Sequence, residues 1–429
     1  MAPPLKPVCR RAFSFVISLC LLASTCAAIA LDTTFGSGGK FTTTFSDTGD
    51  PHSTASRVFV QPSGRIVVVG RHQQQGSDGR VSGIALVGLT TSGSLDTNFG
   101  TGGKVLIWNS AGHSLLTDAH MLTDGSLLLL YQVVQPNTQT PILVKYTPNG
   151  QPDPSFSADA QIRITPATQS VRLAPGINGK TYLLLLCDAN YFLMRLNSDG
   201  SRDGSFAEAG VRSINVHRIP VNQRAFVGMH ELGDGKILLT GYYEDRNSFL
   251  TNGFAMRFDS DTNVDRSFGR QGVTQISLPN GSVQFTRSTV QPDGKLMLGG
   301  YFTFLGSYAL LVRLTARGRP DASFGNAGVA MTSFNNVNGI NGIVTAPDGK
   351  IVVTGTSGDK ALPANQRLFV ARFSAAGVRE DFLLTNFLTN RDAGGADLVI
   401  QPDGKLVAAG FSQNATGFFS QLAVARFTP

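Results

Sequence analysis

Seven almost uninterrupted apolar stretches recur along the chain, each directly after a turn that contains glycine. Residues 66–69, 127–130 and 351–353 belong to three of them. A short apolar run bounded by turn residues is typical of a strand that is covered on both faces. The pattern therefore predicts a set of buried strands, each lying in a sheet with neighbours on both sides.

The turn before each apolar stretch is itself a repeated motif. In its sharpest form it reads Pro-Asp-Gly, as at residues 292–294, 347–349 and 402–404. Proline presets φ, aspartate accepts a local backbone hydrogen bond, and glycine adopts positive φ, so the motif predicts a hairpin. The turn glycines follow one another at intervals of 54–61 residues: Gly64, Gly125, Gly179, Gly235, Gly294, Gly349 and Gly404.

Two further positions recur in the repeat, an acid followed three residues later by an aromatic residue and a base late in a strand. In five consecutive repeats the acid follows the base by eight residues, as in Arg313 and Asp321. A residue that recurs in nearly every repeat is expected to have a structural role. We therefore expect a charge-assisted bond between the repeated base and the repeated acid. The acids are Asp32, Asp96, Asp153, Asp203, Asp265, Asp321 and Glu380, and the bases are Lys145, Arg195, Arg257, Arg313, Arg372 and Arg426, with Gly88 as the exception.

One period holds four expected strands with turn residues at each junction and no helical periodicity. Four strands in about 57 residues are typical of one blade of a β-propeller. The sequence therefore predicts an all-β fold, a seven-bladed β-propeller of four-stranded antiparallel blades, in one domain over residues 31–429. The repeats run over about 31–94, 95–151, 152–201, 202–263, 264–319, 320–378 and 379–429. The two ends of this stretch are halves of one interrupted repeat, so we expect them to lie close together.

The stretches Leu31-Asp32-Thr33-Thr34-Phe35-Gly36 and Gln401-Pro402-Asp403-Gly404-Lys405 resemble the delta-60 repeat family of bacterial β-propellers. The resemblance covers residues 31–429. It implies an exported propeller, in some cases part of a larger surface or outer-membrane protein, and it implies no particular activity. Some positions differ from the pattern of the family, such as Gly88 and the degraded Asp-x-x-Phe turn of the seventh repeat. These differences affect individual blades and not the expected fold.

Residues 1–30 have the form of a cleaved secretory signal, with basic residues before an apolar run and small residues at Ala28 and Ala30. Without this leader the net charge is 33 − 29 = +4, because three of the 36 basic residues and none of the 29 acids leave with it. The mild charge and the absence of a Lys and Arg run give no reason to expect a nucleic-acid partner. After cleavage near Ala30 we expect a monomer without a transmembrane anchor, secreted, periplasmic or outer-membrane associated. Lipidation of Cys26 is an alternative. Only Cys187 remains in the mature chain, as a buried thiol.

Common catalytic motifs are absent from the sequence, including Gly-x-Ser-x-Gly, Cys-x-x-Cys and His-Glu-x-x-His. Twelve residues before the turn glycine, His52, His113 and Asp392 fall in neighbouring blades, and two imidazoles with a carboxylate are a recognised metal-ligand set. Solvated loop residues are the alternative interpretation. We expect no cofactor. The alternative is a divalent metal bound by His52, His113 and Asp392.

The loops between the third and fourth expected strands of each repeat, counted from the Asp-x-x-Phe turn, differ most between repeats, as at 71–82, 132–140, 242–253 and 356–367. Variable loops on a rigid ring are suited to binding. The most binding-like stretch is Tyr242, Tyr243, Glu244, Asp245 and Arg246, with two aromatic residues and mixed charge. We therefore expect a non-catalytic binding or structural module at the cell envelope or outside the cell, whose partner is a protein or polysaccharide. The alternative is an enzyme, a metal-assisted hydrolase or lyase, with a site at the mouth of a central channel.

Overall fold

The structure is a computed structural model. It describes residues 28–45, 52–76, 79–109, 113–135, 138–156, 162, 169–216, 224–334, 337–358, 365–414 and 419–429. Residues 1–27, which hold most of the expected leader, lie outside this part. Within it, the strands β1 to β28 make up nearly all regular structure, and the one helical segment is the short 3-10 turn η1 (Ile177–Gly179). No helix of the described residues is long and apolar enough to cross a membrane.

The strands of the described residues form six hydrogen-bonded sheets, and within each antiparallel group successive strands are neighbours. Four sheets have four strands each: β10 (Gln169–Pro175), β11 (Thr181–Cys187), β12 (Asn190–Leu196) and β13 (Val211–Ile214); β14 (Arg224–Glu231), β15 (Ile237–Glu244), β16 (Thr251–Phe258) and β17 (Val273–Ile276); β18 (Ser282–Val290), β19 (Leu296–Thr303), β20 (Ser307–Leu314) and β21 (Val329–Thr332); β22 (Val337–Thr345), β23 (Ile351–Ser357), β24 (Arg367–Phe373) and β25 (Arg379–Thr385). A fifth sheet has three: β7 (His113–Met121), β8 (Leu127–Gln135) and β9 (Thr138–Tyr146).

The sixth and largest sheet consists of two antiparallel groups. One group is β3 (His52–Val60), β4 (Ile66–Gly76), β5 (Gly79–Leu89) and β6 (Lys104–Ile107); the other is β26 (Asp392–Ile400), β27 (Leu406–Gln413) and β28 (Ser420–Thr428), with β1 (Ala30–Leu31) and β2 (Lys40–Thr43) on the far side of β28. A single parallel pair, Ser420 with His52, joins the two groups. The first and last strands of the described chain therefore lie side by side, as expected.

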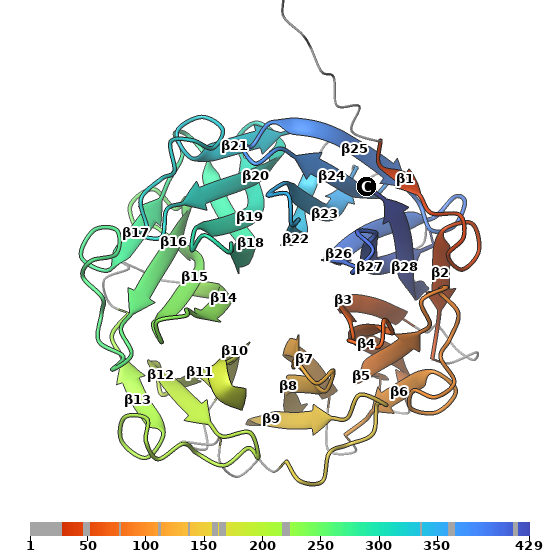
Figure 1. Ribbon diagram of the computed structural model, residues 1–429, viewed down its shortest axis with the longest axis horizontal. Coiled ribbons are helices and arrows are strands. Elements are labelled where there is room, and N and C mark those ends of the chain that lie inside the picture. The colour runs from red at the N-terminus through yellow and green to blue at the C-terminus, as the bar shows by residue number, and fades with distance from the viewer. Residues whose placement is uncertain are drawn as a thin grey trace, which may run out of the picture.

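The sheets stand around a central axis like the segments of a ring (Figure 1). The strands before the hairpins, β3, β7, β10, β14, β18, β22 and β26, are innermost, and the outer strands β2, β6, β13, β17, β21 and β25 lie at the rim. The apolar arms after the hairpins are covered on both faces, since residues 66–69 are fully buried between neighbouring sheets. Core clusters span two sheets at a time. In one of them Phe254 of β16 meets Phe226 of β14 edge to face at 5.5 Å, and the same cluster includes Leu184 of β11 in the preceding sheet.

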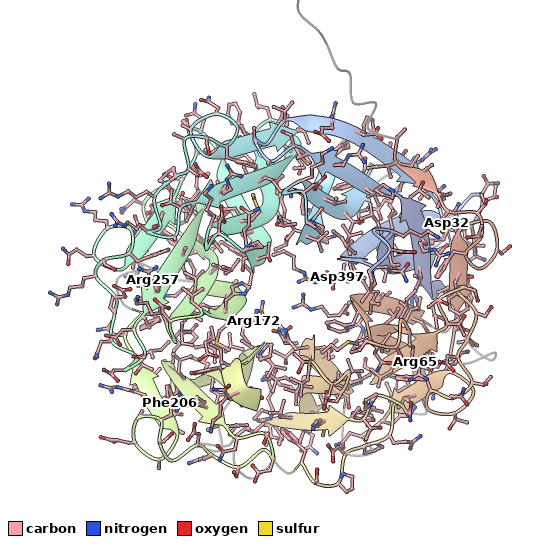
Figure 2. All side chains as sticks on the ribbon, viewed as in Figure 1. Asp32, Arg65, Arg172, Phe206, Arg257 and Asp397 are labelled. Carbon is pink, nitrogen blue, oxygen red and sulfur yellow. The ribbon has the colours of Figure 1, made fainter. Side chains whose placement is uncertain are left out.

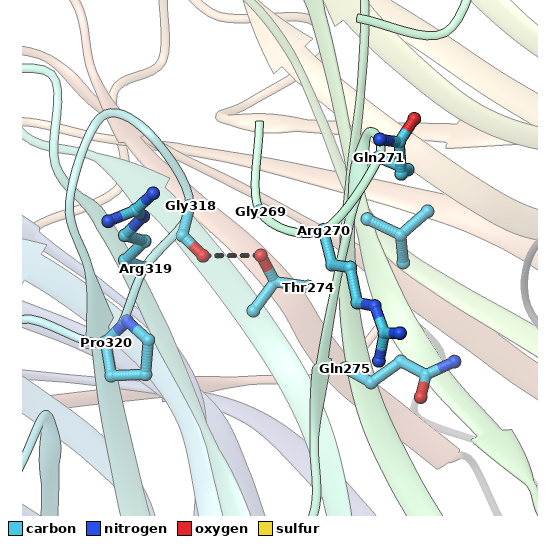
Figure 3. Close-up of a pocket in the computed structure, with 9 residues that line it drawn as sticks. Gly269, Arg270, Gln271, Thr274, Gln275, Gly318, Arg319 and Pro320 are labelled. Atoms are coloured by element: carbon cyan, nitrogen blue, oxygen red, sulfur yellow. Dashed lines mark hydrogen bonds between the residues drawn. The ribbon is translucent and has the colours of Figure 1, made fainter. Parts of the chain in front are cut away.

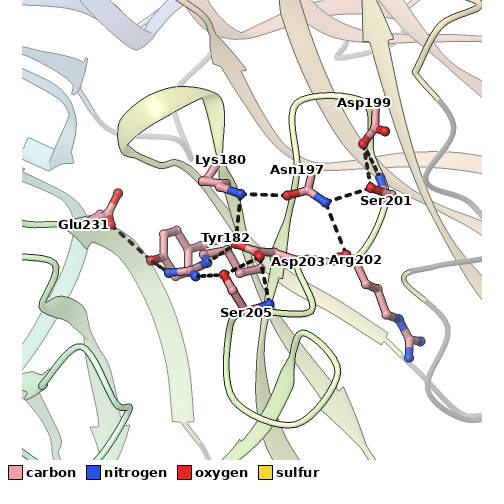
Figure 4. Close-up of polar contacts among 10 residues, drawn as sticks. Lys180, Tyr182, Asn197, Asp199, Ser201, Arg202, Asp203, Ser205 and Glu231 are labelled. Carbon is pink, nitrogen blue, oxygen red and sulfur yellow. Dashed lines mark hydrogen bonds and ion pairs between the residues drawn. The ribbon is translucent and has the colours of Figure 1, made fainter.

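The repeated acid and base pair in the six repeats that have both, as the sequence predicts. Figure 4 shows one copy, in which Asp203 Oδ2 accepts from Arg195 Nε at 2.7 Å and lies 3.0 Å from Lys180 Nζ, while Oδ1 accepts from the Ser205 hydroxyl at 2.6 Å. The Arg195 guanidinium also lies over Phe206, 4.7 Å from the ring centre. We call this arrangement of base, acid, serine and phenylalanine the clamp.

The clamp also ties neighbouring sheets together. Arg313 Nη1 donates to the Ala375 carbonyl at 2.6 Å, which lies in the turn between β24 and β25 of the next sheet. At the exceptional Gly88 the guanidinium comes from the hairpin instead, because Arg65 Nε donates to Asp96 at 2.6 Å. A side chain at Gly88 would meet Phe99 at 2.5 Å, so Phe99 occupies the place that a base has in other repeats.

Candidate functional site

A register shift of the kind that a β-bulge produces interrupts the pairing of each innermost strand. The bulges of β7 and β26, for example, precede Asp118 and Asp397. Figure 2 shows Arg172 and Asp397 near the axis, whereas Asp32, Arg65 and Arg257 of the clamps lie farther out. We call these seven residues the inner ring: Arg57, Asp118, Arg172, Gly228, Arg287, Gly342 and Asp397.

The two acids of the inner ring link neighbouring strands. Asp118 is 4% exposed, binds Arg57 Nη2 at 2.7 Å through Oδ1 and accepts the Leu173 amide of β10 at 3.3 Å through Oδ2. Asp397 accepts the Val58 amide of β3 at 3.2 Å in the same way. Burial favours the neutral acid, but the charge of Arg57 and a hydrogen bond with His120 hold the pKa of Asp118 well below its usual range. Asp118 is therefore a fixed carboxylate and a poor general base.

The arginines of the inner ring outnumber its acids, three to two. Arg287 of β18 extends across the axis and donates to the carbonyls of Ser56 in β3 and Ala396 in β26, at 3.3 and 3.4 Å. Its Nε stands 4.0 Å from Asp397. Burial, followed by the charge of Arg57, lowers the pKa of Arg287 to about 10. The inner ring thus concentrates positive charge at the axis.

Two histidines lie beside the inner ring. His230 Nε2 is 2.8 Å from the Ser288 hydroxyl, which also contacts Thr240, and His120 lies 3.7 Å from Asp118. Burial and the neighbouring His120 lower the pKa of His230 to about 4. The Ser288 hydroxyl fills the space beside Gly228, where a Cβ would come within 2.0 Å of it. These groups are packed against one another and hold neighbouring strands together.

The predicted metal ligands lie at the first residues of three innermost strands. His52 Nδ1 is 3.2 Å from the Ser420 hydroxyl, Asp392 accepts the Gln366 amide at 2.8 Å, and His113 is exposed at the start of β7. Across the described residues, no three His, Cys, Asp or Glu side chains come together as a metal site would require. The structure thus does not bring this set together. The acid-rich turn at 259–265 likewise serves the fold, because Asp265 belongs to a clamp.

The predicted binding stretch is mostly strand, which corrects the sequence-based interpretation of its aromatic residues. Tyr242, Tyr243 and Glu244 end β15, and Tyr243 is 4% exposed in the core with Phe226 and Phe254. Tyr242 packs against the next cluster. Only Asp245 and Arg246 belong to the loop, where Asp245 caps the turn by accepting the amides of Asn247 and Ser248. Alternation along β15, which places Tyr243 on a buried face, is the signal that the loop assignment missed.

The same loop instead exposes a residue that sequence reasoning missed. Phe249 is 74% exposed with φ at +56°, and Leu305, in the corresponding loop of the next sheet, is 94% exposed with φ at +50°. Phe304 and Tyr308 beside Leu305 are 41% and 37% exposed. Large apolar side chains are uncommon in left-handed backbone. Exposed apolar side chains on equivalent loops of adjacent sheets are candidates for a contact site. We call these four residues the apolar loop patch.

The described surface also has several hollows that the sequence did not indicate. One, of about 570 Å³, lies at the rim between Thr274 of β17 and the turn at Gly318, with Arg270 and Arg319 at its edges (Figure 3). Another, of about 690 Å³, gathers Phe59, Met121 and Val399 from innermost strands at the hairpin side of the axis. Neither brings a nucleophile and a base together.

A family model described as "Domain of unknown function (DUF5122) beta-propeller" matches residues 61–99, 135–156, 291–324 and 401–429. These segments hold hairpins, clamps and the closing strand of the ring. The chain is a β-propeller. From here on, each four-stranded unit is called a blade. No curated protein matches the chain in sequence.

Three solved structures illustrate the similarity in structure. The β-propeller domain of the Trilobed protease from Pyrococcus furiosus is 8% identical with a TM-score of 0.47, and the match covers 90% of this chain and 94% of that one. The NanB sialidase from Streptococcus pneumoniae is 10% identical with a TM-score of 0.43, and the match covers 92% of this chain and 68% of that one. Sqt1 from Chaetomium thermophilum, bound to the N-terminus of ribosomal protein L10, is 12% identical with a TM-score of 0.43. The match covers 89% of this chain and 98% of that one. They include enzymes and a binding protein, and none indicates what this chain binds.

Proposed function

We propose that the chain is an exported propeller of the delta-60 repeat type, with seven blades, that acts as a non-catalytic binding module at the cell envelope or outside the cell. Seven blades are supported by the seven hairpin glycines, all with φ between +71° and +85°. They are also supported by the single pair that joins β28 to β3, since one pair is a contact between two blades rather than a shared ladder.

The apolar loop patch is the observation that carries the binding role. Phe249 and Leu305 occupy the loops between the second and third strands of adjacent blades, and equivalent strands run in the same direction in every blade. The two loops therefore open on one side of the ring. The opposite side holds the hairpins and the clamps, which repeat in every blade. The loops on the first side differ in sequence from blade to blade, so a specific partner can recognise them better than it can recognise the repeated hairpins and clamps.

The partner is a protein or polysaccharide of the envelope or exterior. Exposed phenylalanine and tyrosine suit both, because their flat apolar faces pack against apolar side chains and against sugar rings. The patch has its own polar rim, since Asp245, Arg246 and Asn247 precede Phe249 in the same loop. A contact of this kind needs no reacting group.

The test is capture from envelope and culture-medium fractions by immobilised protein. The double variant Phe249→Ser with Leu305→Ser removes the two most exposed members and leaves the core intact. Val378→Ser is the matched control, because Val378 is 64% exposed in a turn on the opposite side of the ring. We expect the double variant to lose a captured species that both the parent and the control retain. Equal capture by all three proteins would refute the patch as the binding surface.

The second candidate is an enzyme with a site at the mouth of the channel, favoured by the charged groups of the inner ring whose pKa values are shifted. Against it, Asp118 is held by Arg57 and a backbone amide. Metal analysis of the purified protein distinguishes the two functions. A stoichiometric metal that is lost in His52→Ala would favour the enzyme over the binding module.

A further inference from the structure

The residues at the end of the expected leader are part of the fold. The Ile29 side chain is 5% exposed and packs in a core cluster with Phe387, Leu406 and Phe427. Ala30 and Leu31 pair with Thr428 and Phe427 of the closing strand. A chain that began at Leu31 would lack the buried isoleucine and half of β1.

The backbone nitrogen of Ile29 has an unusual partner. It lies 2.6 Å from Oδ2 of Asp381, a half-buried residue of β25, while Oδ1 of the same carboxylate accepts the Phe382 amide at 2.8 Å. In the described part of the chain, no Lys, Arg or His side chain forms an ion pair with Asp381, although Lys350 and Arg372 both pair with the adjacent Glu380. Asp381 thus presents an uncompensated negative charge to the nitrogen of Ile29.

Two bonds between residues that the structure describes suit a leader peptidase, which requires small residues one and three positions before the bond. Ala30 and Ala28 satisfy the rule for cleavage after Ala30, and Ala28 and Cys26 satisfy it for cleavage after Ala28. Sequence alone does not separate the two. The fold does, because only the second leaves Ile29 and Ala30 on the mature protein.

We propose that the leader is removed between Ala28 and Ile29, and that the freed α-ammonium of Ile29 forms an ion pair with Asp381. This inference rests on the proposed export. The peptidase hydrolyses one peptide bond with one water, so that Ala28 leaves with a carboxylate and the Ile29 nitrogen takes up protons to become an ammonium. An α-amino group has an ordinary pKa of about 7.7–8.0, and a carboxylate at this distance favours its charged form.

The Asp381 carboxylate already accepts a hydrogen bond from the Ile29 amide, so cleavage would give the donor a charge as well and turn this bond into an ion pair. The ion pair would join the start of the closing blade to the outer strand of the blade before it. The mature chain would be held more firmly than the precursor at this joint, so export and completion of the ring would be coupled.

The first experiment is intact-mass and N-terminal analysis of the product exported by a Gram-negative bacterial host that expresses the full chain with its own leader. We expect the mature protein to begin at Ile29. A product that begins at Leu31 would refute the inference while leaving export in place. A full-length product retained in the cytoplasm would instead contradict the proposed export, so the two failures are distinct.

The second experiment measures the ion pair in the exported protein. Asp381→Asn should lower the melting temperature of the mature chain by roughly 2–4 °C. Asp403→Asn is the matched control, because the Asp403 side chain is 52% exposed and should have little effect. In a cytoplasmic precursor, where residue 29 has no free ammonium, Asp381→Asn should have a smaller effect. Equal losses in mature protein and precursor would refute the ion pair.

If Asp381→Asn does not fold, the pairing is tested on the parent protein by reductive methylation of its amines. We expect the α-amine of Ile29 to react at least tenfold more slowly than exposed lysines. Reaction at the rate of an exposed amine would contradict the pairing.

Discussion

Replacement of Arg313 by alanine removes the base of one clamp from a site where every other partner remains. The side chains of Arg313 and Asp321 are 7% and 9% exposed, and Nε donates to Asp321 at 2.8 Å. Arg313 also donates to the Ala375 carbonyl of the next blade and to the Ser323 hydroxyl, and its guanidinium lies 4.7 Å from the Phe324 ring centre. The substitution therefore breaks four contacts at once.

The size of the effect follows from what is left behind. Removing one partner of a buried ion pair costs about 3–5 kcal/mol, because the other charge stays buried. Lys295 remains 3.4 Å from Asp321 and Ser323 still donates to it, which favours the lower end of that range. The lost contact with Phe324 adds about 0.5–2 kcal/mol. We expect a total destabilisation of about 3.5–5 kcal/mol for Arg313→Ala. We expect about half of that for Arg313→Lys, whose charge remains as it does naturally at Lys145.

The assay is urea and thermal unfolding of parent, Arg313→Ala, Arg313→Lys and the exposed control Arg319→Ala. Burial raises the pKa of Asp321, but hydrogen bonds from Ser323 and the charge of Arg313 outweigh it and lower that pKa to about 2. A depressed pKa means that the pairing stabilises the fold fully above the ordinary aspartate range and is lost as pH falls toward 2. The gap between parent and Arg313→Ala should therefore shrink from pH 5 to pH 2. Equal midpoints for these two proteins at pH 7 would refute the structural role of the clamp.

The other predictions concern closure, the inner ring and the thiol. Deletion of residues 420–429 should leave an aggregating protein, because β28 pairs with β27 on one side and with β1 and β2 on the other; a deletion as soluble as the parent in size-exclusion chromatography would contradict closure. Since the pKa of His230 is lowered to about 4, unfolding should bind a proton and stability should fall between about pH 6.5 and pH 4; His230→Gln should flatten that part of the pH profile, and an unchanged slope would count against it. Asp118→Asn should destabilise by about 3 kcal/mol in urea, because Arg57 would lose its counter-charge, and no loss would show the pair to be dispensable. Cys187, 1% exposed, should react with a thiol reagent only after denaturant is added, whereas rapid native labelling would disagree with its burial.

The features that could be predicted from the sequence are those that repeat at a fixed spacing. The features that were missed depend on alternation within one strand or on residues of different strands that meet at the ring axis. Hairpin glycines, clamps and buried arms recur at fixed spacing, so they could be aligned without a structure. Tyr243 was assigned to a loop because the run of apolar residues before it stops at Thr240. In the structure the strand β15 continues past this point, and the alternation of its side chains places Tyr243 on a buried face. The inner ring stands seven residues before each turn glycine, and comparison at that spacing, rather than at twelve, would have shown its arginines and aspartates. The exposure of Phe249 and Leu305 depends on loop backbone that composition does not specify.

The claim that binding takes place on the loop side of the ring is tested most directly by site-specific photo-crosslinking on intact cells. A photoreactive phenylalanine analogue is placed at Phe249 in one protein and at Val378 in another, since both positions are exposed and they lie on opposite sides of the propeller. The account predicts a discrete crosslinked product from position 249 and none from position 378. A product from position 378 alone would contradict it.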